Sequence, residues 1–105
     1  MKKQDITVII PQGELDTHNC SELRDTLSRE MEKGATKLLV DLSRVGYMDS
    51  AALGVLVSGL KRAREKKAQL KLSGVHGPVE KIFNLTRLTK FFEIYDSLDE
   101  ALAKF

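Results

Sequence analysis

Residues 37–60 have the sequence KLLVDLSRVGYMDSAALGVLVSGL, and this stretch decides the fold class. It opens with the short apolar run 37–42, which is bounded by polar turns and is typical of a strand covered on both faces. An irregular stretch follows at residues 43–50. Residues 51–60 are then almost wholly apolar and lead into charged residues, which predicts a helix. We therefore expect a central strand followed by a helix.

The residues before this unit predict another strand and another helix. Residues 6–10, ITVII, are rich in β-branched side chains and end at Pro11, as a strand that stops there would. Between residues 19 and 33 the apolar side chains recur every four positions, at Leu23, Leu27 and Met31, and Gly34 follows. This pattern predicts an amphipathic helix that ends at a glycine.

The residues after the unit continue the alternation. Residues 68–72 alternate with a period of two, as in a strand, and Pro78 suits the first turn of a third helix. Residues 92–95 resemble a short edge strand, and Ser97 or its neighbour Asp96 can cap a final helix through residue 102. An order of β-α-β-α-β-α-β-α predicts an α/β fold with a mainly parallel sheet.

Composition limits the classes of protein to which the chain can belong. Its 105 residues, 42% apolar and 30% charged, predict a single domain over residues 1–105. No apolar run approaches the roughly 20 residues of a membrane span, and the start resembles no signal peptide, so we expect a cytoplasmic protein. A net charge of +2 is too small to indicate nucleic acid binding, and one cysteine, Cys20, excludes an internal disulfide.

Ser50 is the residue that is best placed to carry a function. The loops that follow parallel strands, at residues 13–18, 43–50 and 73–77, should emerge along one edge of the sheet, where α/β folds usually place their sites. Ser50 directly precedes the apolar helix, so we expect it to be the N-cap. The small residues Ala51, Ala52 and Gly54 leave space for another protein's active site, and a helix N-terminus tolerates a phosphate.

Several motifs resemble those of the STAS domains, and in particular of bacterial anti-sigma factor antagonists. They are GELD at residues 13–16, VDLS at 40–43 and MDSAALG at 48–54, with further similarity over residues 79–102. The resemblance implies a mainly parallel or mixed sheet of about four to five strands flanked by about four helices. Ala52 departs from the family, which usually has glycine there. Only five residues precede Ile6, where the family has an extra strand, so the first edge of the sheet should be short or exposed.

The resemblance also implies a mechanism. A dephosphorylated antagonist would bind an anti-sigma factor that is also a serine protein kinase, and would thereby free a sigma factor for transcription. The kinase would then phosphorylate Ser50, and a serine/threonine phosphatase of the metal-dependent type would reset the switch. The residues implied in partner binding lie in two loops and the start of the helix: Asp16, Asp49, Ser50, Ala51, Ala52, Leu53 and Gly54.

Two alternatives stay open at this point. The chain could be a STAS accessory subunit of a transporter or signalling complex that is never phosphorylated. It could also be a hydrolase built on His18, Asp16 and Ser50, but so short a chain offers little wall for the enclosed pocket and oxyanion hole that such an enzyme needs. We therefore predict no enzyme activity.

We also predict no cofactor and no metal site. His18 and His76 have no carboxylate at ligand spacing, and the glycines match no phosphate-binding loop. Any ATP would belong to the partner kinase.

Overall fold

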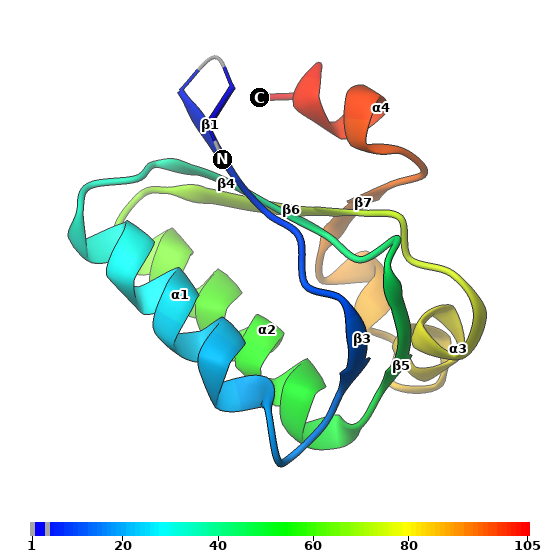
Figure 1. Ribbon diagram of the computed structural model, residues 1–105. Coiled ribbons are helices and arrows are strands. Elements are labelled where there is room, and N and C mark those ends of the chain that lie inside the picture. Colours follow the sequence, from blue (N-terminus) through cyan, green and yellow to red (C-terminus); the bar gives the residue numbers. More distant parts are fainter. Residues whose placement is uncertain (1, 4) are drawn as a thin grey trace.

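The main sheet has five strands in the order β1-β2-β4-β6-β7 (Figure 1). The structure is a computed structural model that describes residues 2–3 and 5–105. Strands β2, β4, β6 and β7 run parallel, and β1 is antiparallel to β2 at the edge. The bounds are β1 Lys2–Lys3, β2 Ile6–Ile9, β4 Lys37–Asp41, β6 Gln69–Ser73 and β7 Glu93–Tyr95. The predicted α/β fold is confirmed, and its first edge strand is only two residues long.

Helices cover both faces of this sheet. Helices α1 (Cys20–Glu32) and α2 (Ser50–Glu65) pack side by side below it in Figure 1, while the short α4 (Leu98–Leu102) lies above it. Helix α3 (Gly77–Leu85) packs against a second, smaller sheet and leads into the one-turn 3₁₀ helix η1 (Leu88–Lys90). Ser97 caps α4 as predicted, because its hydroxyl oxygen accepts a hydrogen bond of 3.1 Å from the Glu100 amide.

The smaller sheet consists of two parallel strands, β3 (Gly13–Leu15) and β5 (Val45–Met48). Sequence patterns predicted loops at both places, and this prediction is wrong. In β5, Val45 and Met48 are buried while Gly46 and Tyr47 are exposed, so the strand lacks the alternation that would have indicated it. The two strands lie about 30 residues apart in sequence and pair with each other. Helix α3 packs against β5 and stabilises the pair further.

The core lies mainly between the sheet and helices α1 and α2. Leu38, Val40 and Leu72 point into this layer, where Leu56 of α2 is fully buried. Leu39 points to the opposite face and packs beneath α4 with Ile6, Val8 and Ala101. Because β4 is covered on both faces, all its central side chains are apolar, which explains the unbroken run in the sequence.

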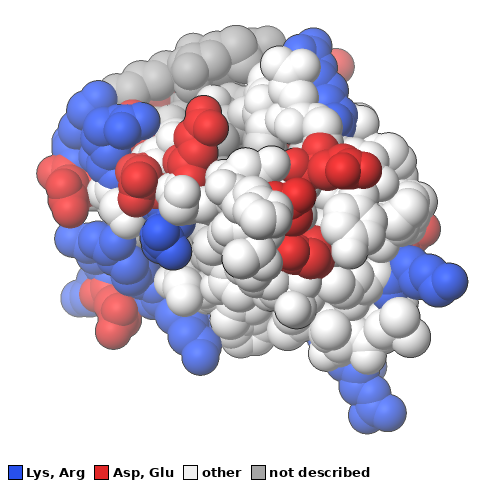
Figure 2. Space-filling model, turned by 60° about the horizontal axis from the view of Figure 1, so that its bottom comes forward, with Lys and Arg blue, Asp and Glu red and all other residues white. Residues whose placement is uncertain are grey.

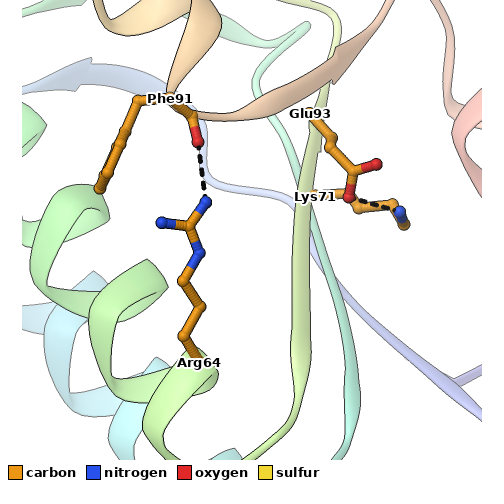
Figure 3. A network of polar contacts seen from close by, with 4 residues as sticks. All are labelled: Arg64, Lys71, Phe91 and Glu93. Atoms are coloured by element: carbon orange, nitrogen blue, oxygen red, sulfur yellow. Dashed lines mark hydrogen bonds and ion pairs between the residues drawn. The ribbon is translucent and has the colours of Figure 1, made fainter.

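One polar contact holds the last strand, β7, and a second holds the segment just before it (Figure 3). Lys71 is only 4% exposed, and its Nζ lies 2.6 Å from Glu93 Oε2 in the neighbouring strand. From α2, Arg64 donates a hydrogen bond of 3.3 Å to the Phe91 carbonyl oxygen and lies over the Phe91 ring. The first contact attaches the three-residue strand to β6, and the second attaches the residues before it to α2.

The core predicts a clear difference between two leucines. Leu56→Ala removes a fully buried side chain and should lower the free energy of unfolding by about 2–5 kcal/mol. Leu85→Ala is the matched control, since Leu85 is 74% exposed, and should change it by less than about 0.5 kcal/mol. Urea denaturation followed by circular dichroism measures both. A loss of equal size in the two variants would contradict this description of the core.

Candidate functional site

Asp49 is the N-cap of helix α2. Its backbone is extended, with φ −96° and ψ 179°, and its Oδ1 accepts a hydrogen bond of 3.0 Å from the Ala52 amide. The prediction that Ser50 is the cap is therefore wrong, although aspartate and serine cap helices about equally well. Ser50 is instead the first residue of the helix.

The Ser50 side chain is exposed at this helix terminus. Within the described part of the chain its hydroxyl has no hydrogen-bond partner, since Asp49 performs the capping. The amides of the first helical turn give this pole a partial positive charge, which favours a negatively charged group. Ser50 thus offers an accessible hydroxyl at a position that suits an anion.

The loop between β3 and α1, residues 16–19, is stabilised by its own hydrogen bonds. Asp16 Oδ1 accepts bonds from the His18 and Asn19 amides, at 2.9 and 3.3 Å. In return, Asn19 Oδ1 accepts a bond of 2.9 Å from the Asp16 amide, and Asn19 Nδ2 donates to the Glu14 carbonyl. The carboxylate of Asp16 therefore shapes the loop that carries it.

Asp49 connects this β3–α1 loop to helix α2. Its Oδ2 accepts two hydrogen bonds from Thr17, at 2.9 Å from the amide and 3.1 Å from the hydroxyl. The strands bring the two loops together, because Leu15 is opposite Met48 in the β3–β5 pair. No local sequence pattern indicates Thr17, because its contact with Asp49 depends on the pairing of β3 and β5, which the sequence did not predict.

These hydrogen bonds lower the pKa of the Asp49 carboxyl below its ordinary value of 3.8. The Ala52 amide makes the largest contribution, because it stabilises the charged carboxylate, and the two Thr17 donors act in the same direction. Partial burial opposes them. Asp49 is thus held as an anion next to Ser50 at neutral pH.

The remaining predicted partner-binding residues differ in accessibility. Ala52 and Leu53 are 0% and 4% exposed and belong to the core, so their side chains offer almost no surface to a partner. Ala51 is half-buried, and Gly54 is exposed one turn after Ser50.

Gly54 has no structural explanation within the described chain. A Cβ added to it would have no atom within 4 Å, and its backbone is ordinary helix without positive φ. Glycine inside a helix destabilises it by roughly 0.5–1 kcal/mol relative to alanine. A bare helix surface beside Ser50 would, however, allow another molecule to approach the backbone closely.

Charge is unevenly distributed over this end of the molecule (Figure 2). The view from the lower end of Figure 1 shows Asp and Glu side chains near the middle of a largely uncharged surface, with Lys and Arg toward its margins. A partner surface that is neutral or basic fits such a face better than an acidic one.

The third predicted loop does not reach Ser50 by any hydrogen bond in the described residues. His76 Nε2 lies 3.0 Å from the Ser43 carbonyl oxygen, next to the ends of β4 and β6. In the proposed hydrolase arrangement Asp16 contacts the backbone of His18, and no bond joins either residue to Ser50 within residues 5–105. A cavity of about 240 Å³ lies apart from Ser50, between the β2–β3 connection and α1.

The family model of the STAS domain matches residues 1–101. The chain belongs to the STAS family. An anti-sigma-B factor antagonist of Listeria monocytogenes is 33% identical to this STAS domain over 86 residues, which are 82% of this chain and 75% of that protein. Among the described residues, no helix is long and apolar enough to cross a membrane.

Solved structures agree with this assignment. A crystal structure of a candidate anti-sigma factor antagonist from Thermotoga maritima has a TM-score of 0.93 and 30% identity, and the match covers 99% of this chain and 90% of that chain. The phosphorylated form of SpoIIAA, from Bacillus, has a TM-score of 0.78 at 23% identity, with 99% and 94% of the two chains covered. The second similarity shows the fold alone.

The hydrogen bonds of Asp49 predict its titration. In an NMR titration of the carboxyl carbons, the midpoint of Asp49 should lie below the ordinary value of 3.8. Because the pKa is lowered in the folded state, the contribution of Asp49 to stability is present above about pH 4 and is lost as the pH falls through its folded pKa. In Thr17→Val, which removes the hydroxyl donor, the midpoint should move up toward 3.8. An unchanged midpoint in this variant would contradict the assigned cause.

Proposed function

We propose that this STAS domain is a cytoplasmic anti-sigma factor antagonist whose binding is controlled by phosphorylation of Ser50. Without the phosphate it binds an anti-sigma factor that is also a serine protein kinase, and a sigma factor is released. The kinase transfers the γ-phosphoryl group of ATP to Ser50 Oγ, which loses its proton, and ADP leaves. A metal-dependent serine/threonine phosphatase hydrolyses the phosphoserine and restores binding.

The observation that carries this proposal is the exposed hydroxyl of Ser50 at the start of α2, which has no hydrogen-bond partner among the described residues. A kinase must reach the oxygen and remove its proton, and a serine that caps a helix would have that oxygen engaged by a backbone amide. Asp49 takes over the capping and leaves Ser50 available. The named relatives, which are antagonists of anti-sigma factors, support the same class of partner.

The surroundings of Ser50 support binding rather than catalysis. The face around it is open, and the nearby side chains of Asp16 and Asp49 are occupied by hydrogen bonds that shape the surface. Exposed Gly54 and half-buried Ala51 allow a partner to pack close to the helix. A phosphate on Ser50 would project into that closely packed contact, so it would be tolerated by the free protein and excluded by the complex.

Phosphorylation is tested directly with the serine kinases of the anti-sigma type from the same genome. Incubation with ATP should add one phosphate, located at Ser50 by mass spectrometry, and Ser50→Ala should add none. Ser50→Ala should keep its affinity for the kinase, whereas Ser50→Asp should lose about tenfold or more through the added charge and bulk. Lys104→Ala, at the α4 end of the chain, is the control and should bind normally.

Wild-type protein that no such kinase modifies would contradict the switch. It would then favour the alternative of a STAS accessory subunit that is never phosphorylated.

Gly54 gives a second, independent test of the binding surface. Gly54→Ala should raise the free energy of unfolding of the isolated domain by about 0.5–1 kcal/mol, since the added methyl group meets open space. If a partner packs against this turn, the same methyl group should weaken binding, as isothermal titration calorimetry would show. A variant that is more stable and binds the kinase equally well would place the interface elsewhere.

A further inference from the structure

Among the described residues, Asp49 is the one side chain that hydrogen-bonds both the start of α2 and the β3–α1 loop. One carboxylate oxygen accepts the Ala52 amide at 3.0 Å, and the other accepts the amide and hydroxyl of Thr17 at 2.9 and 3.1 Å. Ser50, the next residue, makes no such contact within the described chain. Any new charge on Ser50 therefore appears beside the carboxylate that joins these two parts of the surface.

The bonds to Thr17 are separate from those that shape the β3–α1 loop. Residues 16–19 are closed on themselves through Asp16 and Asn19, and those bonds do not involve α2. The side chain of Asp49 adds a link to α2 through Thr17 alone. Loss of that link would free the loop to shift as one unit, with its internal bonds intact.

We infer that phosphorylation of Ser50 breaks the Asp49–Thr17 contact, so that the modified protein differs in the position of the β3–α1 loop as well as in charge. This inference rests on the proposed phosphorylation of Ser50 and specifies how the surface responds to it. The phosphoryl oxygens compete with Asp49 for the first-turn amides of α2, which are the strongest donors at this end. The dianion also repels the adjacent carboxylate.

The repulsion between the phosphate and the Asp49 carboxylate is comparable in size to the hydrogen bonds that hold this carboxylate, which makes a switch possible. Near a protein surface, the repulsion between a phosphate and a carboxylate a few ångströms apart is of the same order as a charge-assisted hydrogen bond. The link to Thr17 consists of two such bonds to an exposed residue, and solvent can replace both donors. The Ala52 amide belongs to the helix itself and can turn to the phosphate instead.

Two acidic residues near Ser50 then move relative to each other. Asp16 lies within the freed loop, while Asp49 stays at the end of β5, held by a backbone hydrogen bond of 3.1 Å from its amide to the Leu15 carbonyl. A partner that recognises the unmodified arrangement meets a displaced loop in addition to the phosphate. The switch thus acts over both loops of the site.

The test uses the full chain with phosphoserine encoded genetically at position 50, which needs no kinase. In amide exchange measured by NMR, the Thr17 amide should exchange at least about tenfold faster than in unmodified protein, as loss of one hydrogen bond predicts. The His18 and Asn19 amides, bound to Asp16, are the internal controls and should keep their rates. Unchanged Thr17 exchange, or equal acceleration of all three amides, would overturn the inference.

Asp49→Asn supplies the matched variant. Its side chain offers one acceptor oxygen in place of two, so it can cap the helix or bind Thr17 but not do both. Thr17 should already exchange fast in this variant, and phosphoserine should add less than about twofold, since coupled changes are not additive. A full additional acceleration would show that phosphate acts on Thr17 by a route other than Asp49.

The two proposals fail in different ways. A chain that no kinase phosphorylates, but whose encoded phosphoserine frees Thr17, would disprove the proposed function and leave the coupling intact. If a kinase modifies Ser50 but the exchange of the Thr17 amide is unchanged, the coupling would be disproved and the proposed function would stand.

Discussion

In β4, successive side chains are buried on opposite faces of the sheet, with Leu38 and Val40 on the side of α1 and α2 and Leu39 on the side of α4. Parallel strands are connected by helices, and these helices cover both faces of the sheet, which sets the order of the elements on either side of β4. The same constraint sends the chain out of β4 at one edge of the sheet. Strand β5 and the start of helix α2, which carries Ser50, follow directly after this point in the chain.

A buried polar cluster fixes the direction of the exit. Asp41, the last residue of β4, accepts hydrogen bonds from the hydroxyls of Ser73 and Ser43 at 2.8 and 2.6 Å, so its buried carboxylate is satisfied. Gly74 lies against this cluster, and a Cβ there would come within 2.8 Å of the Ser43 amide nitrogen. Because Gly74 also has φ +70°, only glycine fits without strain. After Asp41, the chain passes through residues 42–44 and enters β5.

Strand β5 brings the two loops of the candidate site together. Its pairing with β3 places the loop after Leu15 next to the helix after Met48, and Asp49 joins the two with both oxygens of one carboxylate. Because Asp49 caps the helix, the neighbouring Ser50 is not needed for capping. The arrangement therefore separates two roles that a helix terminus often combines, since one residue satisfies the helix and the next is presented to other molecules.

The sequence by itself determined the parallel α/β order, the place of helix α2 and the position of Ser50 at the start of that helix. Hydrophobic periodicity and turn residues act over a few positions, so they can be recognised locally. Only the tertiary structure decided that Asp49, and not Ser50, caps the helix, that Ala52 and Leu53 are core, and that β3 and β5 are strands. These features depend on contacts between residues about 30 positions apart, such as Thr17 with Asp49, and no local pattern encodes such a contact.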